Sequence, residues 1–112
     1  MNTKNRVKSN KDFQTIIHQG STLKNKVFVC HFLLTKNQHV RVGIAVSKKR
    51  GNAVRRNLIK RQIRAICMAN IDFAKSYDLM VVARDSYDVN DYARMQEAFI
   101  TLLTSFERNL HA

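Results

Sequence analysis

The sequence predicts an α+β protein, an α/β sandwich in which helices pack on a small mixed sheet, with elements in the order α-β-β-α-β-α. Three runs are rich in β-branched and aromatic residues, and three others repeat apolar residues at helical spacing. The 112 residues suffice for one domain with one modest core. No proline-, glycine- or serine-rich stretch suggests a linker. We therefore expect a single domain over residues 1–112.

The first helix is predicted over residues 10–19. Ser9 precedes it as an N-cap, and Asp12 follows three residues later in an arrangement that resembles a capping box. The helix carries one narrow apolar face formed by Phe13, Ile16 and Ile17. Gly20 is expected to end it in the left-handed conformation that glycine favours after a helix.

Two strands are predicted next, over residues 27–35 and 40–47, joined by a polar turn into an antiparallel hairpin. The first is apolar on both faces, so we expect both faces to be covered. The second alternates valine and isoleucine with smaller residues such as Gly43 and Ala45. Its small-residue face leaves room for another element to lie close to the sheet.

A strand, helix, strand order follows, over residues 40–47, 53–69 and 78–84. This order suggests a parallel strand pair joined by a crossover helix, with Asn52 as the helix N-cap. The last helix is predicted over residues 92–110. Its apolar residues form one stripe at helical spacing: Met95, Phe99, Leu102, Leu103, Phe106 and Leu110.

Charge is unevenly distributed along the chain. The formal net charge is +12, yet residues 13–71 contain twelve lysines and arginines and no acidic residue, whereas residues 72–112 have a net charge of −3. Positive charges concentrated in this way repel one another in the folded protein unless a polyanion neutralises them. The composition therefore favours nucleic acid as the partner.

The helix over residues 53–69 concentrates this charge on one side. Its polar face carries two neighbouring rows of residues spaced by four, one of Arg56, Lys60 and Arg64 and the other of Asn57 and Arg61. Solvated helix faces usually mix charge signs, whereas like charges repeat here without an acid. A membrane surface is a poor alternative, because the apolar face lacks bulky aromatics and is needed for the sheet. RNA fits better than DNA, since strands flank the helix and no helix-turn-helix partner is evident.

Protein-borne catalysis has little support in the sequence. The histidines are scattered, and Cys30-His31 with Cys67 does not match a zinc pattern. Asp85, Asp88 and Asp91 could suggest a two-metal nuclease, but they lie in a predicted turn with capping residues. We expect both cysteines to be buried thiols in a cytoplasmic protein, since no signal or membrane-spanning segment is evident.

One long motif has a known counterpart. Arg41-Val-Gly-Ile-Ala-Val-Ser-Lys-Lys leads through a basic loop into Gly51-Asn-Ala-Val-Arg-Arg-Asn-Leu-Ile-Lys-Arg-Gln-Ile-Arg64. Further matches are Asp12-Phe13-Gln14, Phe28-Val29 and Val81-Val82-Ala83-Arg84. Over about residues 6–108 the chain resembles the bacterial ribonuclease P protein subunit.

This resemblance implies a fold and a function. The fold would contain a left-handed βαβ crossover, against the usual right-handed rule. The protein would be the accessory subunit of an endoribonuclease whose RNA subunit removes the 5′ leader of precursor tRNA. Magnesium would be held by the RNA and the substrate, with no metal bound by the protein alone. The implied partners are the catalytic RNA and precursor tRNA, without a membrane or an obligatory protein partner.

The resemblance also implies two sets of site residues. The RNA-contacting set is Lys48, Lys49, Arg56, Asn57, Lys60, Arg61 and Arg64. The leader cleft would lie between the sheet and the first helix, lined by Phe13, Ile17, Phe28, Val29, His31 and Val42. The sequence departs from the family at Leu58, where an arginine is usual. We expect Leu58 to pack on the buried side and Arg55 to supply the missing RNA contact.

The alternative from a different class is a ribosomal or rRNA-assembly protein that binds RNA without turnover. Charge alone does not separate the two. The strand-to-helix motif and the small residues beside Phe13 favour the ribonuclease P type.

Overall fold

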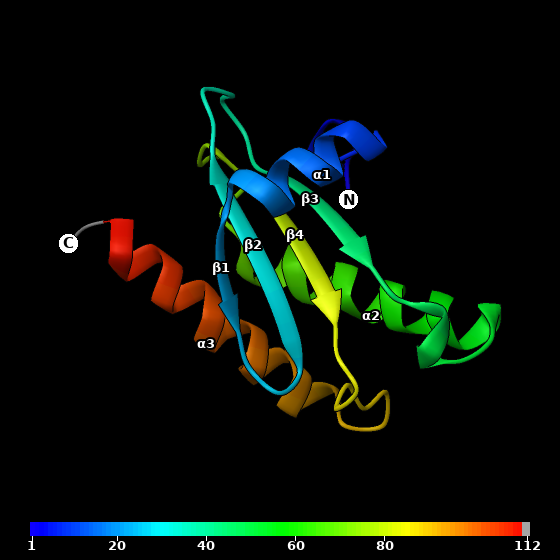
Figure 1. The fold of residues 1–112 in the computed structure, drawn as a ribbon. Helices are drawn as coiled ribbons and strands as arrows, with labels where there is room; N and C mark the ends of the chain where they lie inside the picture. The colour runs from blue at the N-terminus through cyan, green and yellow to red at the C-terminus, as the bar shows by residue number, and fades with distance from the viewer. Residues whose placement is uncertain (111–112) are drawn as a thin grey trace.

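The computed structural model describes residues 1–110 and contains a four-stranded sheet with helices on both faces (Figure 1). The helices are α1 (Asn10–Gln19), α2 (Ala53–Asn70) and α3 (Tyr92–Leu110). The strands are β1 (Ser21–Lys24), β2 (Phe28–Leu34), β3 (Arg41–Ala45) and β4 (Tyr77–Ala83). Two short 3₁₀ turns, η1 (Thr3–Asn5) and η2 (Lys48–Arg50), precede α1 and α2. The predicted fold class and order of the main elements are confirmed.

The strands lie in the order β1-β2-β4-β3. β2 is antiparallel to both β1 and β4, whereas β3 runs parallel to β4. The predicted parallel pair is confirmed, but the predicted hairpin between residues 27–35 and 40–47 is wrong, because β4 lies between those strands. β4 is the most continuously buried strand, and only a central position covers such a strand on both edges and both faces.

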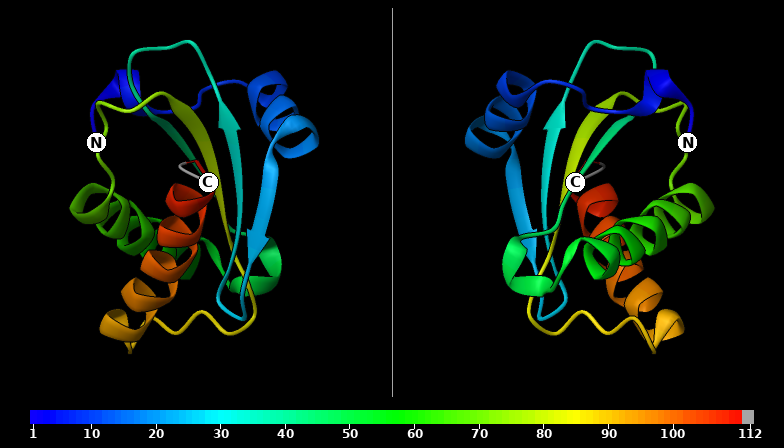
Figure 2. Two further views of the ribbon diagram at one scale, coloured as in Figure 1. Left: turned by 90° about the vertical axis from the view of Figure 1, so that its left-hand side faces the viewer. Right: turned by 90° about the vertical axis from the view of Figure 1, so that its right-hand side faces the viewer.

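The crossover from β3 through α2 to β4 is left-handed, as the family resemblance implied. Figure 1 views the sheet with α1 in front, and Figure 2 shows that α2 and α3 cover the opposite face. With the parallel strands pointing down in Figure 1, the chain leaves β3, passes behind the sheet and returns in β4 on the left. This connection departs from the right-handed rule that most βαβ units follow.

The main core fills the space between the sheet and the pair α2 and α3. It takes Phe28, Cys30 and Phe32 from β2, and Leu79 and Val81 from β4. The remaining principal contributions come from the helices: Ile59, Ile63, Ile66 and Cys67 from α2, and Met95, Phe99, Leu102, Leu103 and Phe106 from α3. The predicted stripe of α3 is thus buried, apart from Leu110, which is exposed.

The opposite face of the sheet is only partly covered. α1 packs there through a small cluster of Ile16 with Val7 and Met80. On β2, the residues of this face, Val29 and His31, remain half-buried. The expectation that β2 is covered on both faces is therefore wrong, because α1 is too short to cross the whole sheet. An open sheet surface beside α1 results.

The N-caps of α1 and α2 form as the sequence predicts. The Ser9 hydroxyl oxygen accepts a hydrogen bond from the Asp12 N–H at 3.1 Å, and the Asn52 side-chain oxygen accepts one from the Arg55 N–H at 2.9 Å. Gly20 differs from its prediction, since its φ is −78°. Glycine is needed there for close packing: a Cβ would lie 2.5 Å from the Ile16 carbonyl oxygen and 2.8 Å from that of Phe32.

Candidate nucleic-acid interface

The polar face of α2 is open to solvent. Asn57 and Arg61 are exposed, while Arg56, Lys60 and Arg64 are half-exposed. On the other side of the helix, the buried Ile59, Ile63, Ile66 and Cys67 hold it against the sheet and α3. No ion pair formed within residues 1–110 involves a cation of α2. The five predicted RNA-binding residues of this helix therefore lie together with their charges uncompensated.

The turn before α2 extends this basic surface. Lys48 and Lys49 are exposed in η2, whereas Arg50 turns back and pairs with Asp85. Gly51 then reverses the chain with φ of 129°, a conformation that disfavours residues with a side chain. A Cβ there would also approach the Arg55 side chain at 3.1 Å. The glycine thus lets the chain pass tightly from the lysine turn into α2.

The N-terminal half of α2 differs from the prediction at one position. Leu58 is 37% exposed, so the expectation that it packs on the buried side is wrong. The contact of α2 with the rest of the protein is narrow, and Leu58 lies outside it, as does the highly exposed Val54. Arg55 is exposed in the first turn. Its side chain is thus free to approach RNA, although its contact with RNA stays a prediction.

The second part of the site is the open sheet face beside α1. Phe13 and Ile17 point from α1 toward this face and pack against its small cluster. The Phe13 ring covers Gly43, where a Cβ would lie 2.6 Å from the ring. The room expected beside the small residues of β3 is therefore occupied by this ring. Val29 and His31 stand half-exposed on the same face of β2.

Two residues predicted in this cleft lie elsewhere. Phe28 is fully buried on the opposite face and meets the rings of Tyr87 and Phe99 edge-on. Val42 is 2% exposed and also faces the main core. Side chains alternate along a strand, so Phe28 and Val29 cannot both face α1. Placing Phe28 and Val42 on the open cleft surface is therefore wrong, and Phe13, Ile17, Val29 and His31 remain.

Histidine 31 is tied to the neighbouring strand. Its Nδ1 lies 3.0 Å from the Thr22 hydroxyl oxygen of β1, directly across the strand pair. Partial burial lowers the pKa of His31 below its ordinary value. The neutral imidazole is therefore favoured near neutral pH, and it presents a flat ring on the open sheet surface.

Arg41 forms a buried ion pair within the sheet and a second, partly exposed contact with α1. Arg41 of β3 donates to Asp78 of β4 from Nε to Oδ1 at 2.9 Å and from Nη2 to Oδ2 at 2.6 Å. Its Nη1 also reaches Oδ2 of Asp12 in α1 at 3.3 Å. Asp78 is 3% exposed, and its bidentate contact raises the pKa of Arg41. One arginine thus joins three elements at the covered end of the open face.

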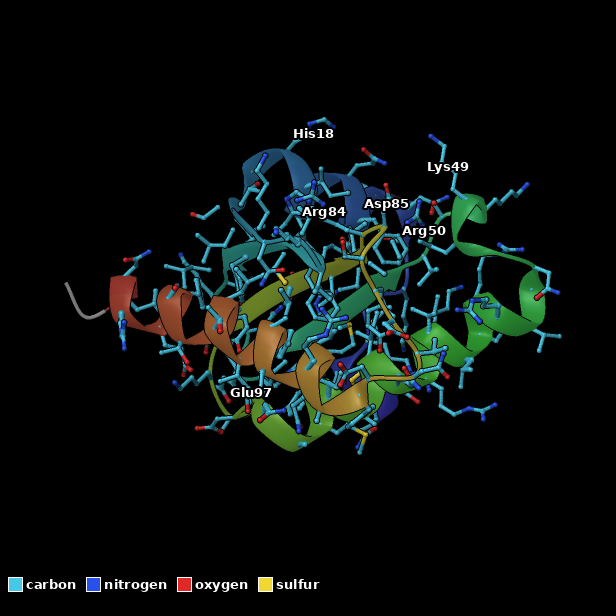
Figure 3. The ribbon with its side chains drawn as sticks, turned by 90° about the horizontal axis from the view of Figure 1, so that it is seen from below. His18, Lys49, Arg50, Arg84, Asp85 and Glu97 are labelled. Carbon is cyan, nitrogen blue, oxygen red and sulfur yellow. The ribbon has the colours of Figure 1, made fainter. Side chains whose placement is uncertain are left out.

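Sequence reasoning missed three basic residues near these surfaces. Lys26 and Arg84 line a shallow hollow at the end of the sheet where β4 finishes. Figure 3 shows Arg84 and Asp85 at this end, with Arg50 beside Asp85 and Lys49 projecting away from the body. Arg6, in the N-terminal segment, lines another hollow with Lys60 and Arg64. Arg6 is far from the basic motif in sequence, so only the fold brings it beside Lys60 and Arg64.

Residues 1–110 contain no group of three metal-ligating side chains. Cys30 and Cys67 are buried free thiols, as predicted, and burial raises the pKa of Cys67 to about 12. None of the helices formed by residues 1–110 combines the length and apolar character of a bilayer span.

These features define a class of protein. The domain has a four-stranded sheet, a helix face whose cations have no acidic partner within residues 1–110, and on the other side of the sheet an open surface with Phe13 and His31. These are features of RNA-binding proteins, in which phosphate contacts and base stacking contribute to recognition. Comparison with known proteins specifies the family. A model of the family described as Ribonuclease P matches residues 1–107.

Individual relatives agree with the family match. The chain is 44% identical over 98 residues to the ribonuclease P protein component of Streptococcus agalactiae, covering 88% of this chain and 90% of that protein. The RNase P protein of Staphylococcus aureus has a similar structure, with a TM-score of 0.79 and 37% identity over 89% of this chain and 93% of that one. The RNase P protein of Thermotoga maritima is also similar, with a TM-score of 0.77 and 31% sequence identity, covering 88% of this chain and 94% of that one. The chain belongs to the ribonuclease P protein family, and so is a subunit of this tRNA-processing ribonucleoprotein and a partner of its RNA.

Proposed function

We propose that this chain binds the catalytic RNA of ribonuclease P with the polar face of α2 and holds the 5′ leader of precursor tRNA on the open sheet face beside α1. The RNA subunit would cleave the phosphodiester, using magnesium ions held by the RNA and its substrate. The polypeptide would supply binding and positioning and no catalytic group.

The observation that carries this proposal is the unpaired cationic face of α2. Arg56, Lys60, Arg61 and Arg64 have no acidic partner within residues 1–110, so phosphates are the groups that would relieve their mutual repulsion. Asn57 lies among them and can both donate and accept hydrogen bonds. Lys48 and Lys49 continue the surface toward the end of the sheet.

The geometry of the open sheet face supports the proposal that the 5′ leader binds there. A single strand presents its bases, and bases stack on flat side chains such as Phe13 and His31. Lys26 and Arg84 lie at the end of the sheet, where they can meet phosphates of the same strand. The sheet face and the α2 face are separate surfaces of the same domain, so the protein can hold substrate and catalyst together.

A reconstitution experiment tests the proposal. The purified chain is added to a bacterial ribonuclease P RNA at low magnesium, and cleavage of precursor tRNA is measured. We expect stimulation, because protein cations reduce the repulsion between two polyanions that magnesium otherwise screens. The control is the triple variant Arg56→Ala, Lys60→Ala, Arg61→Ala, which should stimulate far less. Cleavage that the wild-type chain does not stimulate would overturn the proposal.

A further inference from the structure

A hollow of about 170 Å³ lies along the outer edge of β3. It is formed by four parts of the fold: the N-terminal segment, α1, β3 and α2. The residues that line it are the apolar Met1, Val7, Phe13, Val42 and Ile44, together with Gly43 and the three cations Arg6, Lys60 and Arg64. The hollow thus joins the α2 face to the edge of the sheet.

The three cations converge from two distant parts of the sequence. Arg6 is exposed on the N-terminal segment, whereas Lys60 and Arg64 stand one turn apart on α2. None of them takes part in an ion pair within residues 1–110. Arg64 Nε is shielded from solvent and has no hydrogen-bond partner among those residues. Three like charges around one small hollow repel one another, so an anion bound there would be favoured.

The edge of β3 adds hydrogen-bonding groups. The N-terminal segment follows the first part of this edge. The Asn5 side-chain amide donates to the Val40 carbonyl oxygen at 2.8 Å, the Val7 N–H donates to the Val42 carbonyl oxygen at 3.1 Å, and Arg6 bridges to Val42. Backbone groups alternate in direction along a strand, so Ile44 points its N–H and carbonyl to the same outer side as Val42. Ile44 lines the hollow, and no strand lies beyond β3 in the sheet. These groups are available to a ligand.

We infer that this edge hollow is an RNA subsite in which Arg6, together with Lys60 and Arg64, binds a backbone phosphate, with the adjoining nucleotide against Ile44. The inference rests on the proposed function and adds the N-terminal segment to the RNA-binding surface. The chemistry required is that of one nucleotide: a phosphate for the cations, and a ribose or base for the apolar wall and the strand edge. Either the catalytic RNA or the leader could supply it.

The experiment compares Arg6→Ala with Lys4→Ala in the full chain. Both remove one cation from the N-terminal segment, but Lys4 does not line the hollow. Three affinities are measured over a range of salt concentrations. They are the affinity of the protein for the catalytic RNA, that of the holoenzyme for precursor tRNA, and that of the holoenzyme for mature tRNA. Urea unfolding checks that the variants are folded, which we expect because Arg6 and Val7 meet β3 through backbone groups.

We expect Arg6→Ala to weaken binding by roughly 3- to 10-fold and to flatten the log–log salt slope by up to about 0.9, whereas Lys4→Ala leaves the slope unchanged. A loss for the catalytic RNA identifies that RNA as the source of the phosphate. A loss confined to precursor tRNA identifies the leader. Equal slopes for Arg6→Ala, Lys4→Ala and wild type would overturn the subsite. If instead the wild-type chain bound none of these RNAs, the proposed function itself would fail.

Discussion

Arg41 shows how a single side chain supports this site. Its bidentate contact neutralises Asp78, which is almost fully buried, while its contact with the partly exposed Asp12 is longer and single. A buried charge that loses its partner is strongly destabilising, whereas an exposed pair contributes little. The two acidic partners of Arg41 should therefore differ sharply in their importance for folding.

We predict that Arg41→Ala lowers the free energy of unfolding by about 3 to 5 kcal/mol, because Asp78 is left buried without a cation. Asp12→Ala should lower it by less than about 1 kcal/mol. Urea unfolding monitored by circular dichroism measures both. Similar losses for the two variants would mean that Asp78 finds another partner or solvent when Arg41 is removed.

His31 should make stability depend on pH. Its pKa is lowered in the folded protein, so between that value and the unfolded value of about 6.5 the unfolded chain binds more protons. The contribution of neutral His31 to the free energy of unfolding is fully present above the pKa of His31 in the unfolded chain. It is lost as the pH falls through the lower pKa of His31 in the folded protein. We predict that wild type loses more stability than His31→Gln between pH 7.5 and 5.5 in urea unfolding. Parallel losses would show that protonation of His31 is not the cause.

Residue roles were predictable from sequence where periodicity alone decides them. The exposed positions of Asn57 and Arg61 follow from helical spacing, and they were predicted correctly. Leu58 was misplaced because its exposure depends on how narrow the contact of α2 is, which only the assembled fold determines. Phe28 was assigned to the open face although strand alternation with Val29 forbids it, and this error could have been avoided from the sequence.

At the scale of elements, the cations of α2 should act through phosphates. We predict that Arg61→Ala and Lys60→Ala each weaken holoenzyme assembly and flatten its salt dependence by up to about 0.9 in log–log slope. The matched control is Arg108→Ala, which removes an exposed cation from the last turn of α3. Filter binding of the catalytic RNA at several salt concentrations provides the slopes. A slope unchanged from wild type would mean that these side chains do not touch phosphate.

Element boundaries were more predictable than strand neighbours. α1, α2 and α3 begin and end within one residue of the predicted ranges, because capping residues and apolar spacing are local signals. β1 was missed, since Ser21–Lys24 is short, polar and exposed at the edge of the sheet. The hairpin between β2 and β3 was wrong because pairing depends on which strand must be buried most completely, and β4 comes later in the chain.

At the scale of the whole molecule, the sheet separates two tasks. Its inner face binds α2 and α3 and contains most of the core, while its outer face is left partly open by the short α1. α2 is held by its own apolar side, so its cations are free on the other. A contact made on the outer face should therefore affect substrates with a leader without altering the affinity for the catalytic RNA.

Phe13 provides the test of this separation. We predict that Phe13→Ala weakens holoenzyme binding of precursor tRNA by about 1 to 3 kcal/mol, the range expected for a lost base–aromatic stack, while binding of mature tRNA and of the catalytic RNA changes little. Phe13 also packs in the cluster under α1, so the control is Phe13→Leu, which keeps that cluster filled but removes the flat ring. If stacking is the cause, Phe13→Leu remains as stable as wild type and still loses affinity for the leader. If Phe13→Leu binds precursor as wild type does, or if precursor and mature tRNA weaken equally, Phe13 serves only to pack α1 on the sheet.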